Sequence, residues 1–457
     1  MSAFPTNLFA GKRFAVLGLG RNGLPAARAL TAMGADVVAW DDNVAARVDA
    51  NDVALRDLRS DDFAFDVLVM SPGIPHALPV PHPVAARARA WGVPILSDAE
   101  LLFRAVRQAG SHARFVGITG TNGKSTTTAL LAHILAGAGR KVAAGGNLGP
   151  ASLALKLLPD NGTYVLEMSS YMLERIATLR FDAAVMLNLS ADHLDRHGDM
   201  AGYLAAKRAI FDRQAAGDIA LLGIDDDDSR AMADWLCGRP ARVITVSGRR
   251  SADVWSDSGT LRDADGVILS MAEAPALPGE HNAQNAAAAA AIATTYGVSR
   301  VDIARGLRSF PGLPHRQQRL GTIGGITFIN DSKATNADAA ARALGCYDRL
   351  VWIAGGIAKD GGIESLVPLF PRIARALLIG RDAPVLAATL AAHGVKHDIA
   401  GTLDAAVPAA FAAARAADAP VVLLSPACAS FDQFSGFDAR GDRFATLVSQ
   451  LARGRAA

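Results

Sequence analysis

The fold of this chain is decided by residues 114–136, which read RFVGITGTNGKSTTTALLAHILA. An apolar run typical of a buried strand, Arg114–Ile118, leads into a glycine-rich turn, and a helical pattern follows over Ser125–Ala136. A turn of this kind between a strand and a helix presents backbone N–H groups to phosphate oxygens. We therefore predict an α/β domain that binds ATP or GTP.

The side chains of this turn fit the same chemistry. Lys124 would neutralise phosphate oxygens, and Ser125 or Thr126 would bind Mg²⁺. The turn departs from the common GxxxxGK[ST] pattern, because five residues separate Gly117 from Gly123. A chance GKS is the alternative, but the strand before it and the helix after it argue against chance. The predicted nucleotide-binding residues are Gly120, Thr121, Asn122, Gly123, Lys124, Ser125 and Thr126.

A second glycine-rich turn, GLGRNG at residues 18–23, lies between a predicted strand and a predicted helix over Leu24–Met33. With Asp41 about 20 residues further on, it fits a dinucleotide-binding turn. A turn that binds nothing is the alternative, and other nucleoside diphosphates fit equally well. A nicotinamide dehydrogenase would leave the first turn idle, whereas an ATP-driven enzyme acting on a nucleoside diphosphate would use both.

Strands and helices alternate along the chain, which predicts parallel sheets with ligands at the carboxyl ends of the strands. The 457 residues suggest about three domains. We predict a Rossmann-like domain over residues 1–107, a P-loop domain over 108–311 and a second Rossmann-like domain over 312–457. Other predicted elements are strands Asp36–Trp40, Asp66–Met70, Tyr164–Met168, Ala183–Leu189, Thr327–Asn330, Arg349–Ala354, Ala376–Ile379 and Val421–Ser425, and helices Ala85–Ala90 and Ala283–Thr295.

The composition excludes several classes of protein. Hydrophobic residues make up 51% and the net charge is +2, so no global field draws the chain to nucleic acid or to an anionic membrane. Cys237, Cys346 and Cys428 lie far apart and match no disulfide or zinc spacing. The N-terminal stretch lacks the features of a secretory signal, and no apolar run reaches the roughly 18 residues of a membrane helix. We expect a cytoplasmic protein without a nucleic-acid or membrane partner.

Polar residues end two predicted strands of the central domain. Glu167 ends one and His193 follows the next, an arrangement that suits a hard cation beside a phosphate site. For His193 alone, a hydrogen-bonded structural histidine is about as probable. Only eight of the 46 Lys and Arg residues are lysines, which favours a specific need for each lysine that remains. Lys207, in a helical stretch, nevertheless fits an ordinary solvated lysine best on this pattern alone.

Further candidates follow in the second half of the chain. Asn282 and Asn285 share a helix face, so their carboxamides could bind a purine edge, although helix capping is the simpler interpretation. Arg316 could reach a phosphate, Asp331 a ribose hydroxyl and Lys333 a substrate carboxylate.

Taken in order, these motifs resemble those of the Mur ligase family over nearly the whole chain. They read GxGxxG, SPGI, TGTNGKST, GGNLG, EMSSYMLE, NLSADHLDRH, HNAQN, GLPHR, NDSKATN and LSPACASFDQF. NDSKATN and SPACASFDQF resemble most narrowly the members that add D-glutamate to UDP-N-acetylmuramoyl-L-alanine. A ligase for another amino acid and a folylpolyglutamate synthetase are the nearest alternatives. The latter would have no use for the turn at residues 18–23.

The resemblance implies ATP-dependent amide formation through an acyl phosphate, with two Mg²⁺ ions. It implies catalytic roles for Lys124, His193 and Lys207, and carbamylation of Lys207, whose amine would become a metal-binding carboxylate. ATP would lie between the second and third domains, in a monomer. The implied metal-binding residues are Ser125, Glu167, His193 and Lys207, and the implied ATP contacts include Asn282, Asn285, Arg316 and Asp331.

The resemblance also implies the substrate contacts. Those to the UDP-muramoyl substrate are Gly18, Gly20, Arg21, Asn22, Asp41, Ser71, Gly73, Asn147 and Ser169, and those to D-glutamate are Lys333, Thr335, Lys359, Ser430 and Phe437. One segment departs from the family, because residues 41–43 read Asp-Asp-Asn and lack the cation that the uridine side of the family often carries. Arg21 is the candidate to replace it.

Overall fold

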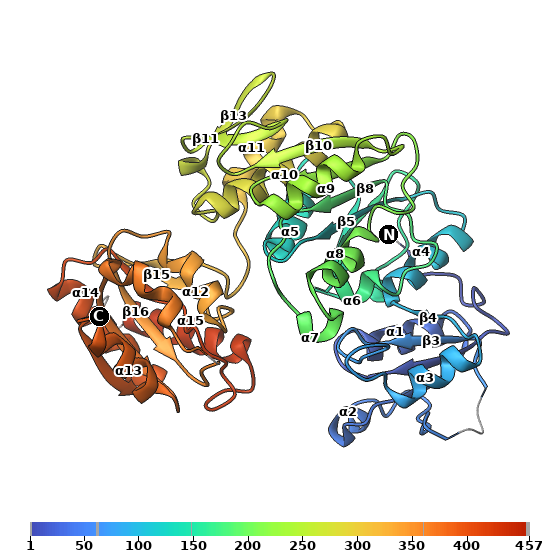
Figure 1. The fold of residues 1–457 in the computed structure, drawn as a ribbon, viewed down its shortest axis with the longest axis horizontal. Helices are drawn as coiled ribbons and strands as arrows, with labels where there is room; N and C mark the ends of the chain where they lie inside the picture. The colour runs from blue at the N-terminus through green and yellow to red at the C-terminus, as the bar shows by residue number, and fades with distance from the viewer. Residues whose placement is uncertain (1, 61–63, 148, 360, 454–457) are drawn as a thin grey trace. The chain divides into compact units, whose positions relative to one another are not determined.

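The computed structural model describes residues 2–60, 64–147, 149–359 and 361–453. They form three sheets with helices packed on them (Figure 1), which confirms the predicted α/β class. The chain divides into two compact units, Met1–Glu273 with Glu280–Ser309 and Ala274–Gly279 with Phe310–Ala457. The predicted boundaries at residues 107 and 311 stay predictions. Leu148 of the GGNLG stretch lies outside the described residues, as do the outer ends of the first and third predicted domains.

The first sheet is parallel, in the order β2-β1-β3-β4. Its strands are apolar because helices cover both faces. The strands are β1 Arg13–Leu17, β2 Asp36–Trp40, β3 Val67–Met70 and β4 Ile95–Leu96, and the helices are α1 Gly23–Ala32, α2 Val44–Val48, α3 Pro83–Ala90 and α4 Asp98–Gln108.

The central sheet has nine strands in the order β13-β12-β11-β10-β9-β8-β5-β7-β6. Its strands are β5 Arg114–Thr119, β6 Val142–Gly146, β7 Thr163–Glu167, β8 Ala183–Met186, β9 Ile219–Gly223, β10 Arg242–Ser247, β11 Val254–Asp257, β12 Thr260–Asp263 and β13 Gly266–Ser270. Its helices are α5 Lys124–Gly137, α6 Ser170–Leu173, α7 Leu194–His197, α8 Met200–Arg208, α9 Asp227–Leu236, α10 Glu280–Thr295 and α11 Arg300–Ser309, with 3-10 turns η1 Ser152–Ala154 and η2 Met271–Glu273.

The prediction of purely parallel sheets is wrong at the edge of this sheet, where β11, β12 and β13 are antiparallel. Ser258 and Gly259 alone connect β11 to β12, and their φ values are 48° and 77°. Two residues cannot span a parallel crossover, and positive φ at both positions matches the twist of a hairpin.

Helix α10 contains the predicted alanine-rich helix and begins three residues before it, at Glu280. Every residue from Asn282 to Ala293 is buried, as expected for a helix that is apolar on all sides. It packs against α5, the helix that follows the P-loop.

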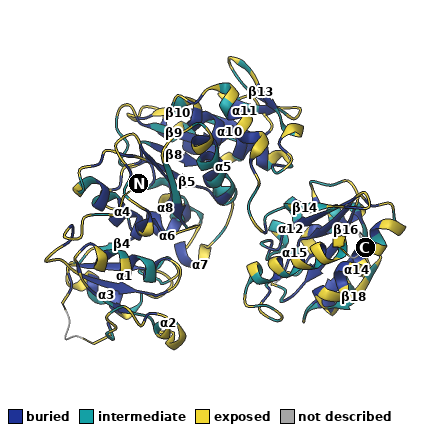
Figure 2. Cartoon of the chain, turned by 180° about the vertical axis from the view of Figure 1, so that it is seen from behind, coloured by how far each residue is buried: buried dark blue, intermediate teal, exposed yellow. Residues whose placement is uncertain are grey.

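The C-terminal sheet has the order β14-β15-β19-β16-β17-β18 and is parallel except for the β14–β15 hairpin. Val351 and Ile353 of β16 enter one core, whereas Trp352 and Ala354 enter the core on the other face. Figure 2 shows the buried strands between the more exposed helices. The elements are β14 Gln318–Ile323, β15 Ile326–Asn330, β16 Leu350–Gly355, β17 Ile373–Ile379, β18 His397–Gly401, β19 Val421–Leu424, α12 Ala337–Leu344, η3 Glu364–Arg372, α13 Ala383–Ala392, α14 Leu403–Ala416 and α15 Phe437–Arg453.

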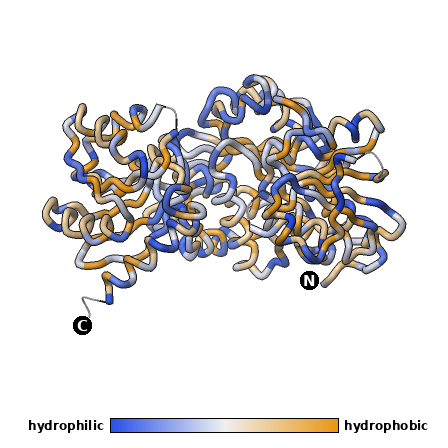
Figure 3. Tube along the Cα trace, turned by 90° about the horizontal axis from the view of Figure 1, so that it is seen from below, coloured by the Kyte–Doolittle hydropathy of each residue, from blue (hydrophilic) through white to orange (hydrophobic). Residues whose placement is uncertain are grey.

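Hydrophobic and hydrophilic stretches alternate along the chain trace in Figure 3. In the described part of the chain, no helix combines the length and hydrophobicity that a membrane span requires.

Candidate active site

The glycine-rich turn that carries Lys124 connects the carboxyl end of β5 to the start of α5. Asn188, which follows β8, anchors it by accepting from the N–H of Asn122 at 2.8 Å and from the N–H of Thr121 at 2.9 Å. Lys124 Nζ donates to the carbonyl oxygens of Gly120 and Thr121 at 2.9 and 2.8 Å. The turn therefore lies at the N-terminus of a 14-residue helix, where the helix dipole favours a phosphate group.

Glu167 ends β7, the neighbour of β5, so its carboxylate lies at the same sheet edge as the turn. Glu167 is 2% exposed, and its Oε1 accepts from Asn147 Nδ2 at 2.7 Å. Its Oε2 is buried and has no hydrogen-bond partner among the residues that the structure describes. A buried carboxylate oxygen without a donor suits a hard cation such as Mg²⁺. Ser169 caps α6 by accepting from the N–H of Met172 at 3.3 Å.

His193 follows β8, on the other side of β5, and caps α7 with a φ of 53°. Its side chain is 48% exposed, with Nε2 3.4 Å from Asp192 Oδ2. Its ring packs on Tyr171 with the centroids 5.0 Å apart. The imidazole is thus accessible to a ligand at this edge.

Lys207, on α8, is 1% exposed. Its Nζ donates to the carbonyl of Gly120 at 2.8 Å and to Thr119 Oγ1 at 3.3 Å, and it lies 4.7 Å from the centroid of the Tyr203 ring. Burial, with the nearby ammonium of Lys124, holds the pKa of Lys207 well below its ordinary value. The interpretation of Lys207 as a solvated lysine is therefore wrong.

In the described ranges, no three or more His, Cys, Asp or Glu side chains lie close enough to hold a metal ion by themselves. A magnesium site at this edge would therefore take further oxygen ligands from substrate phosphates, as Mg²⁺ commonly does. The unpaired oxygen of Glu167 fits such a site, and Ser125, whose hydroxyl is the second predicted ligand, lies in the first turn of α5.

Asn282 and Asn285 lie within α10, so the capping interpretation is wrong. They are 6% and 2% exposed, and Asn285 Nδ2 donates to Asn282 Oδ1 at 3.1 Å. Asn285 Oδ1 accepts from Thr127 Oγ1 at 3.1 Å, and a Cβ added at Gly123 would lie 2.2 Å from that same oxygen. Both carboxamides are thus packed beside the P-loop.

In the first sheet, the predicted UDP-binding turns follow β1, β2 and β3 and lie together at one edge. Ser71 Oγ donates to the carbonyl of Gly18 at 2.9 Å, and the N–H of Leu19 donates to Asp41 Oδ2 at 2.7 Å. Two side chains of the first turn bond to residues outside it. The guanidinium of Arg21 donates to the carbonyl of Gly149 at 3.1 and 3.3 Å, and Asn22 Nδ2 donates to the carbonyl of Gly146 at 3.3 Å and to Asp98 Oδ2 at 3.4 Å.

Gly23→Ala is expected to lower the free energy of unfolding by about 3 kcal/mol, because the added Cβ would lie 1.7 Å from the carbonyl oxygen of Gly18. Gly20→Ala is the matched control in the same turn. Apart from its two chain neighbours, no described residue comes within 4 Å of its added Cβ, so the free energy of unfolding in urea should change by less than about 0.5 kcal/mol. Equal stability of the two variants would contradict this packing.

In the C-terminal unit, the loops that follow β15, β19 and β16 lie at one edge, because these strands are neighbours. They hold Lys333, Thr335, Ser430 and Lys359, and α15 begins with Phe437. Lys333 Nζ lies 3.7 Å from the centroid of the Phe437 ring, a cation–π contact between two predicted D-glutamate residues.

Arg440, which the sequence did not single out, connects these three loops. It is 1% exposed and donates to Ser332 Oγ at 3.0 Å, to the carbonyls of Ser332 and Cys428 at 2.9 and 3.1 Å, and to that of Gly355 at 3.4 Å. The sequence carries one indication that Arg440 is buried. Arg440 lies four and eight residues before the apolar Phe444 and Val448, and all three are buried on α15.

Asp331, predicted to contact ATP, is 7% exposed and accepts from Ser425 Oγ at 2.8 Å and from the N–H of Gln317 at 3.1 Å. Burial raises the pKa of Asp331 to about 7. Arg316 lies in the segment before β14.

Asp331→Asn should therefore stabilise the C-terminal unit increasingly as pH rises. In the wild type the folded state binds this proton up to about pH 7 and the unfolded state only to about pH 4, so stability falls between these values. The advantage of the variant should grow over that window and be constant above it. Urea unfolding at pH 5, 7 and 8.5 checks this. If the gain in free energy of unfolding of Asp331→Asn over the wild type does not depend on pH, the carboxyl of Asp331 does not become a buried charge in this range.

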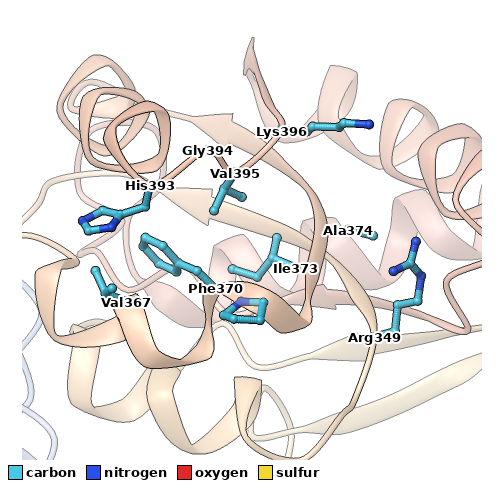
Figure 4. A pocket seen from close by; sticks show the side chains of 10 residues that line it. Arg349, Val367, Phe370, Ile373, Ala374, His393, Gly394, Val395 and Lys396 are labelled. Atoms are coloured by element: carbon cyan, nitrogen blue, oxygen red, sulfur yellow. The ribbon is translucent and has the colours of Figure 1, made fainter.

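A surface hollow of about 500 Å³ lies at the amino ends of β16, β17 and β18, opposite the loops of the predicted site. Figure 4 shows Val367, Phe370 and His393 at one end of it and Arg349 and Lys396 at the other. None of the predicted site residues lines it.

Two family models match the chain. The Mur ligase middle domain matches residues 118–293, and the Mur ligase glutamate ligase domain matches residues 315–428. The first spans the P-loop, Glu167, His193, Lys207 and the two asparagines of α10. The second spans Asp331 and most of the predicted D-glutamate residues.

Among curated proteins, the UDP-N-acetylmuramoylalanine–D-glutamate ligase of Caulobacter vibrioides is 48% identical and covers 98% of each chain. The enzyme of the same name from Paramagnetospirillum magneticum is 50% identical, over 98% of this chain and 99% of that protein. Among solved structures, the UDP-N-acetylmuramate–alanine ligase of Thermotoga maritima matches with a TM-score of 0.60 and 16% identity, covering 96% of this chain and 99% of that one. This last match shows a shared fold.

Proposed function

Because this chain belongs to the Mur ligase family, we propose that it joins D-glutamate to UDP-N-acetylmuramoyl-L-alanine in a reaction driven by ATP. The reaction is a step of peptidoglycan precursor synthesis. The names of the curated relatives support it, since they match over 98% of the chain. In the structure, the observation that carries the proposal is the sheet edge at β5, where the P-loop, Glu167 and Lys207 meet.

The chemistry follows from the weakness of a carboxylate as an electrophile. An oxygen of the substrate carboxylate attacks the γ-phosphorus of ATP, giving an acyl phosphate and ADP. The amine of D-glutamate then attacks the acyl carbon, and the C–O bond to phosphate breaks as the amide forms. The amine loses its proton in this step, and phosphate leaves with one oxygen of the original carboxylate.

The P-loop residues hold the phosphates in this proposal. The backbone N–H groups at the start of α5 and the ammonium of Lys124 offset the negative charge that gathers as the carboxylate approaches. Ser125, Glu167, His193 and a modified Lys207 would hold Mg²⁺ at two sites. When bound, Mg²⁺ would supply further positive charge to the phosphate and carboxylate oxygens.

Lys207 is proposed to carry a carbamate. Burial lowers the pKa of Lys207 and so raises the fraction of neutral amine, and only a neutral amine attacks CO₂. The carbamate N–H retains the donor that now reaches the carbonyl of Gly120, while the added carboxylate provides oxygen ligands.

The substrate ends are assigned by the predicted contacts. The turns at residues 18–23, Asp41 and Ser71–Gly73 would bind the UDP end, and Asn147 and Ser169 the muramoyl part. Asn282, Asn285, Arg316 and Asp331 would contact ATP. Lys333, Thr335, Lys359, Ser430 and Phe437 would bind D-glutamate, whose two carboxylates suit the two ammonium groups.

We further propose that the protein acts as a cytoplasmic monomer with small-molecule partners only. The near-zero net charge supports the absence of a nucleic-acid partner. Light scattering after size exclusion tests the monomer.

Phosphate release from ATP and Mg²⁺ tests the function, with UDP-N-acetylmuramoyl-L-alanine and, in turn, D-glutamate, L-glutamate, L-lysine and meso-diaminopimelate. The proposal predicts release that requires both the UDP substrate and D-glutamate. Release with a different amino acid would agree with a Mur ligase but would overturn the assignment of D-glutamate as the substrate. Tight NAD binding without phosphate release would favour the dehydrogenase alternative.

A further inference from the structure

Arg175 follows α6 in the central part of the first unit, and its hydrogen bonds to described residues join the guanidinium to the segment Met70–His76, which begins at the end of β3 in the first sheet. Nη1 donates to the carbonyls of Met70 and Ser71 at 3.0 and 2.9 Å, and Nη2 donates to that of Ile74 at 2.5 Å. Nε donates to His76 Nδ1 at 3.4 Å. The planar fork of an arginine thus bonds at four points of residues 70–76.

Burial makes this arrangement costly. Arg175 is 2% exposed, and burial together with the neighbouring Arg196 lowers the pKa of Arg175 to about 9. Arg196, which is 7% exposed, donates to the carbonyls of Ile74 and Gly73 at 3.0 and 3.4 Å. The two like charges placed against one loop repel each other, and the nearby carboxylate of Glu174 offsets part of this repulsion.

The segment that they hold carries Ser71 and Gly73. Its other side is fixed by the first glycine-rich turn, since Ser71 Oγ bonds to the carbonyl of Gly18 and a Cβ at Gly18 would lie 2.7 Å from Ser71 Cβ. Arg175 itself lies six residues after Ser169 and eight after Glu167, on the connection that leaves β7. The same short connection therefore joins the segment Met70–His76, which bonds to the first glycine-rich turn through Ser71, to the edge where the chemistry is proposed.

We propose that Arg175 is a positioning residue for the UDP substrate, which fixes the main chain of Met70–Ile74 through its carbonyl oxygens. This inference rests on the proposed function, which assigns Ser71 and Gly73 to the UDP end. As a positioning residue, Arg175 would touch neither the substrate nor the reacting atoms. Its loss should weaken binding of one substrate and leave the chemical step intact.

The test compares Arg175→Ala, Arg175→Lys and the control Arg180→Ala, whose guanidinium pairs instead with Asp218 at 2.7 Å. For Arg175→Ala, we expect the KM for UDP-N-acetylmuramoyl-L-alanine to rise about tenfold, with kcat and the KM values for ATP and D-glutamate changed less than about twofold. The KM of Arg175→Lys for the UDP substrate should lie between those of the wild type and Arg175→Ala, because an ammonium cannot bond at four points. Arg180→Ala should match the wild type.

An unchanged KM for the UDP substrate in folded Arg175→Ala would overturn the inference, and so would an equal rise in all three KM values. If Arg175→Ala does not fold, Arg175→Lys decides by the same criterion. Hydrogen exchange of the peptide over residues 70–76 provides a readout that does not depend on turnover. Faster exchange in the Arg175 variants supports the positioning role, and unchanged exchange overturns it. This readout decides even if the wild type does not use the UDP substrate, so failure of the inference can be told apart from failure of the proposed function.

Discussion

Lys207→Ala is expected to lower kcat by about 1,000-fold or more, because it removes the proposed carbamate and with it a metal-binding carboxylate. Bicarbonate should not restore activity, since alanine has no amine to modify. Lys207→Arg should be equally inactive, although it keeps a positive charge, because a guanidinium does not form this carbamate. Steady-state phosphate release measures all three effects.

The control is Lys156→Ala, at an exposed lysine of the same unit, which should retain wild-type activity. Removing CO₂ should lower wild-type activity reversibly, and ¹³C NMR after exposure to ¹³CO₂ should show one carbamate that Lys207→Arg lacks. Near-wild-type turnover by folded Lys207→Ala would contradict the proposed role of a carbamate on Lys207. If activity is lost, thermal unfolding of the variants shows whether the loss comes from the missing carbamate or from loss of fold.

Arg440→Ala is expected to lower the free energy of unfolding of the C-terminal unit by about 3–5 kcal/mol. The substitution leaves the buried carbonyls of Ser332, Cys428 and Gly355 without the donor that now reaches each of them. Two of these carbonyls belong to the loops of the predicted D-glutamate site and the third ends β16, directly before the remaining loop, so kcat/KM for D-glutamate should fall at least about 100-fold. Urea unfolding and steady-state kinetics measure the two effects.

Arg443→Ala is the matched control, three residues further along the same helix. Arg443 pairs with Asp404 at the surface, with the two side chains 40% and 51% exposed, and such pairs contribute little. We expect a change below about 0.5 kcal/mol and unchanged kinetics for this variant. If Arg440→Ala behaves like Arg443→Ala, the three loops do not depend on the buried guanidinium.

Local patterns predicted the elements that local interactions determine. The P-loop and α5 were predicted within one residue, because the change from apolar run to glycines to helical periodicity lies within 23 residues. The edge hairpin of β11 and β12 was missed, although its Ser258-Gly259 connection carried a turn signal.

The burial of charged side chains was not predictable in the same way. Lys207 meets the carbonyl of a glycine 87 residues earlier, and Arg175 meets carbonyls about a hundred residues away. Such contacts depend on tertiary packing, and carbonyl acceptors leave no mark in a sequence. For Lys207, the resemblance to the Mur ligases corrected what residue patterns alone suggested.

The most direct test of the proposed reaction follows the oxygen atoms. UDP-N-acetylmuramoyl-L-alanine labelled with ¹⁸O in both carboxylate oxygens is incubated with the protein, ATP, Mg²⁺ and D-glutamate, and the phosphate and the amide product are analysed by mass spectrometry. Activation through an acyl phosphate predicts one ¹⁸O atom in each phosphate released and one in each new amide, and a site for D-glutamate predicts no turnover on L-glutamate. Unlabelled phosphate would contradict activation through an acyl phosphate, and turnover on L-glutamate would contradict the assignment of D-glutamate.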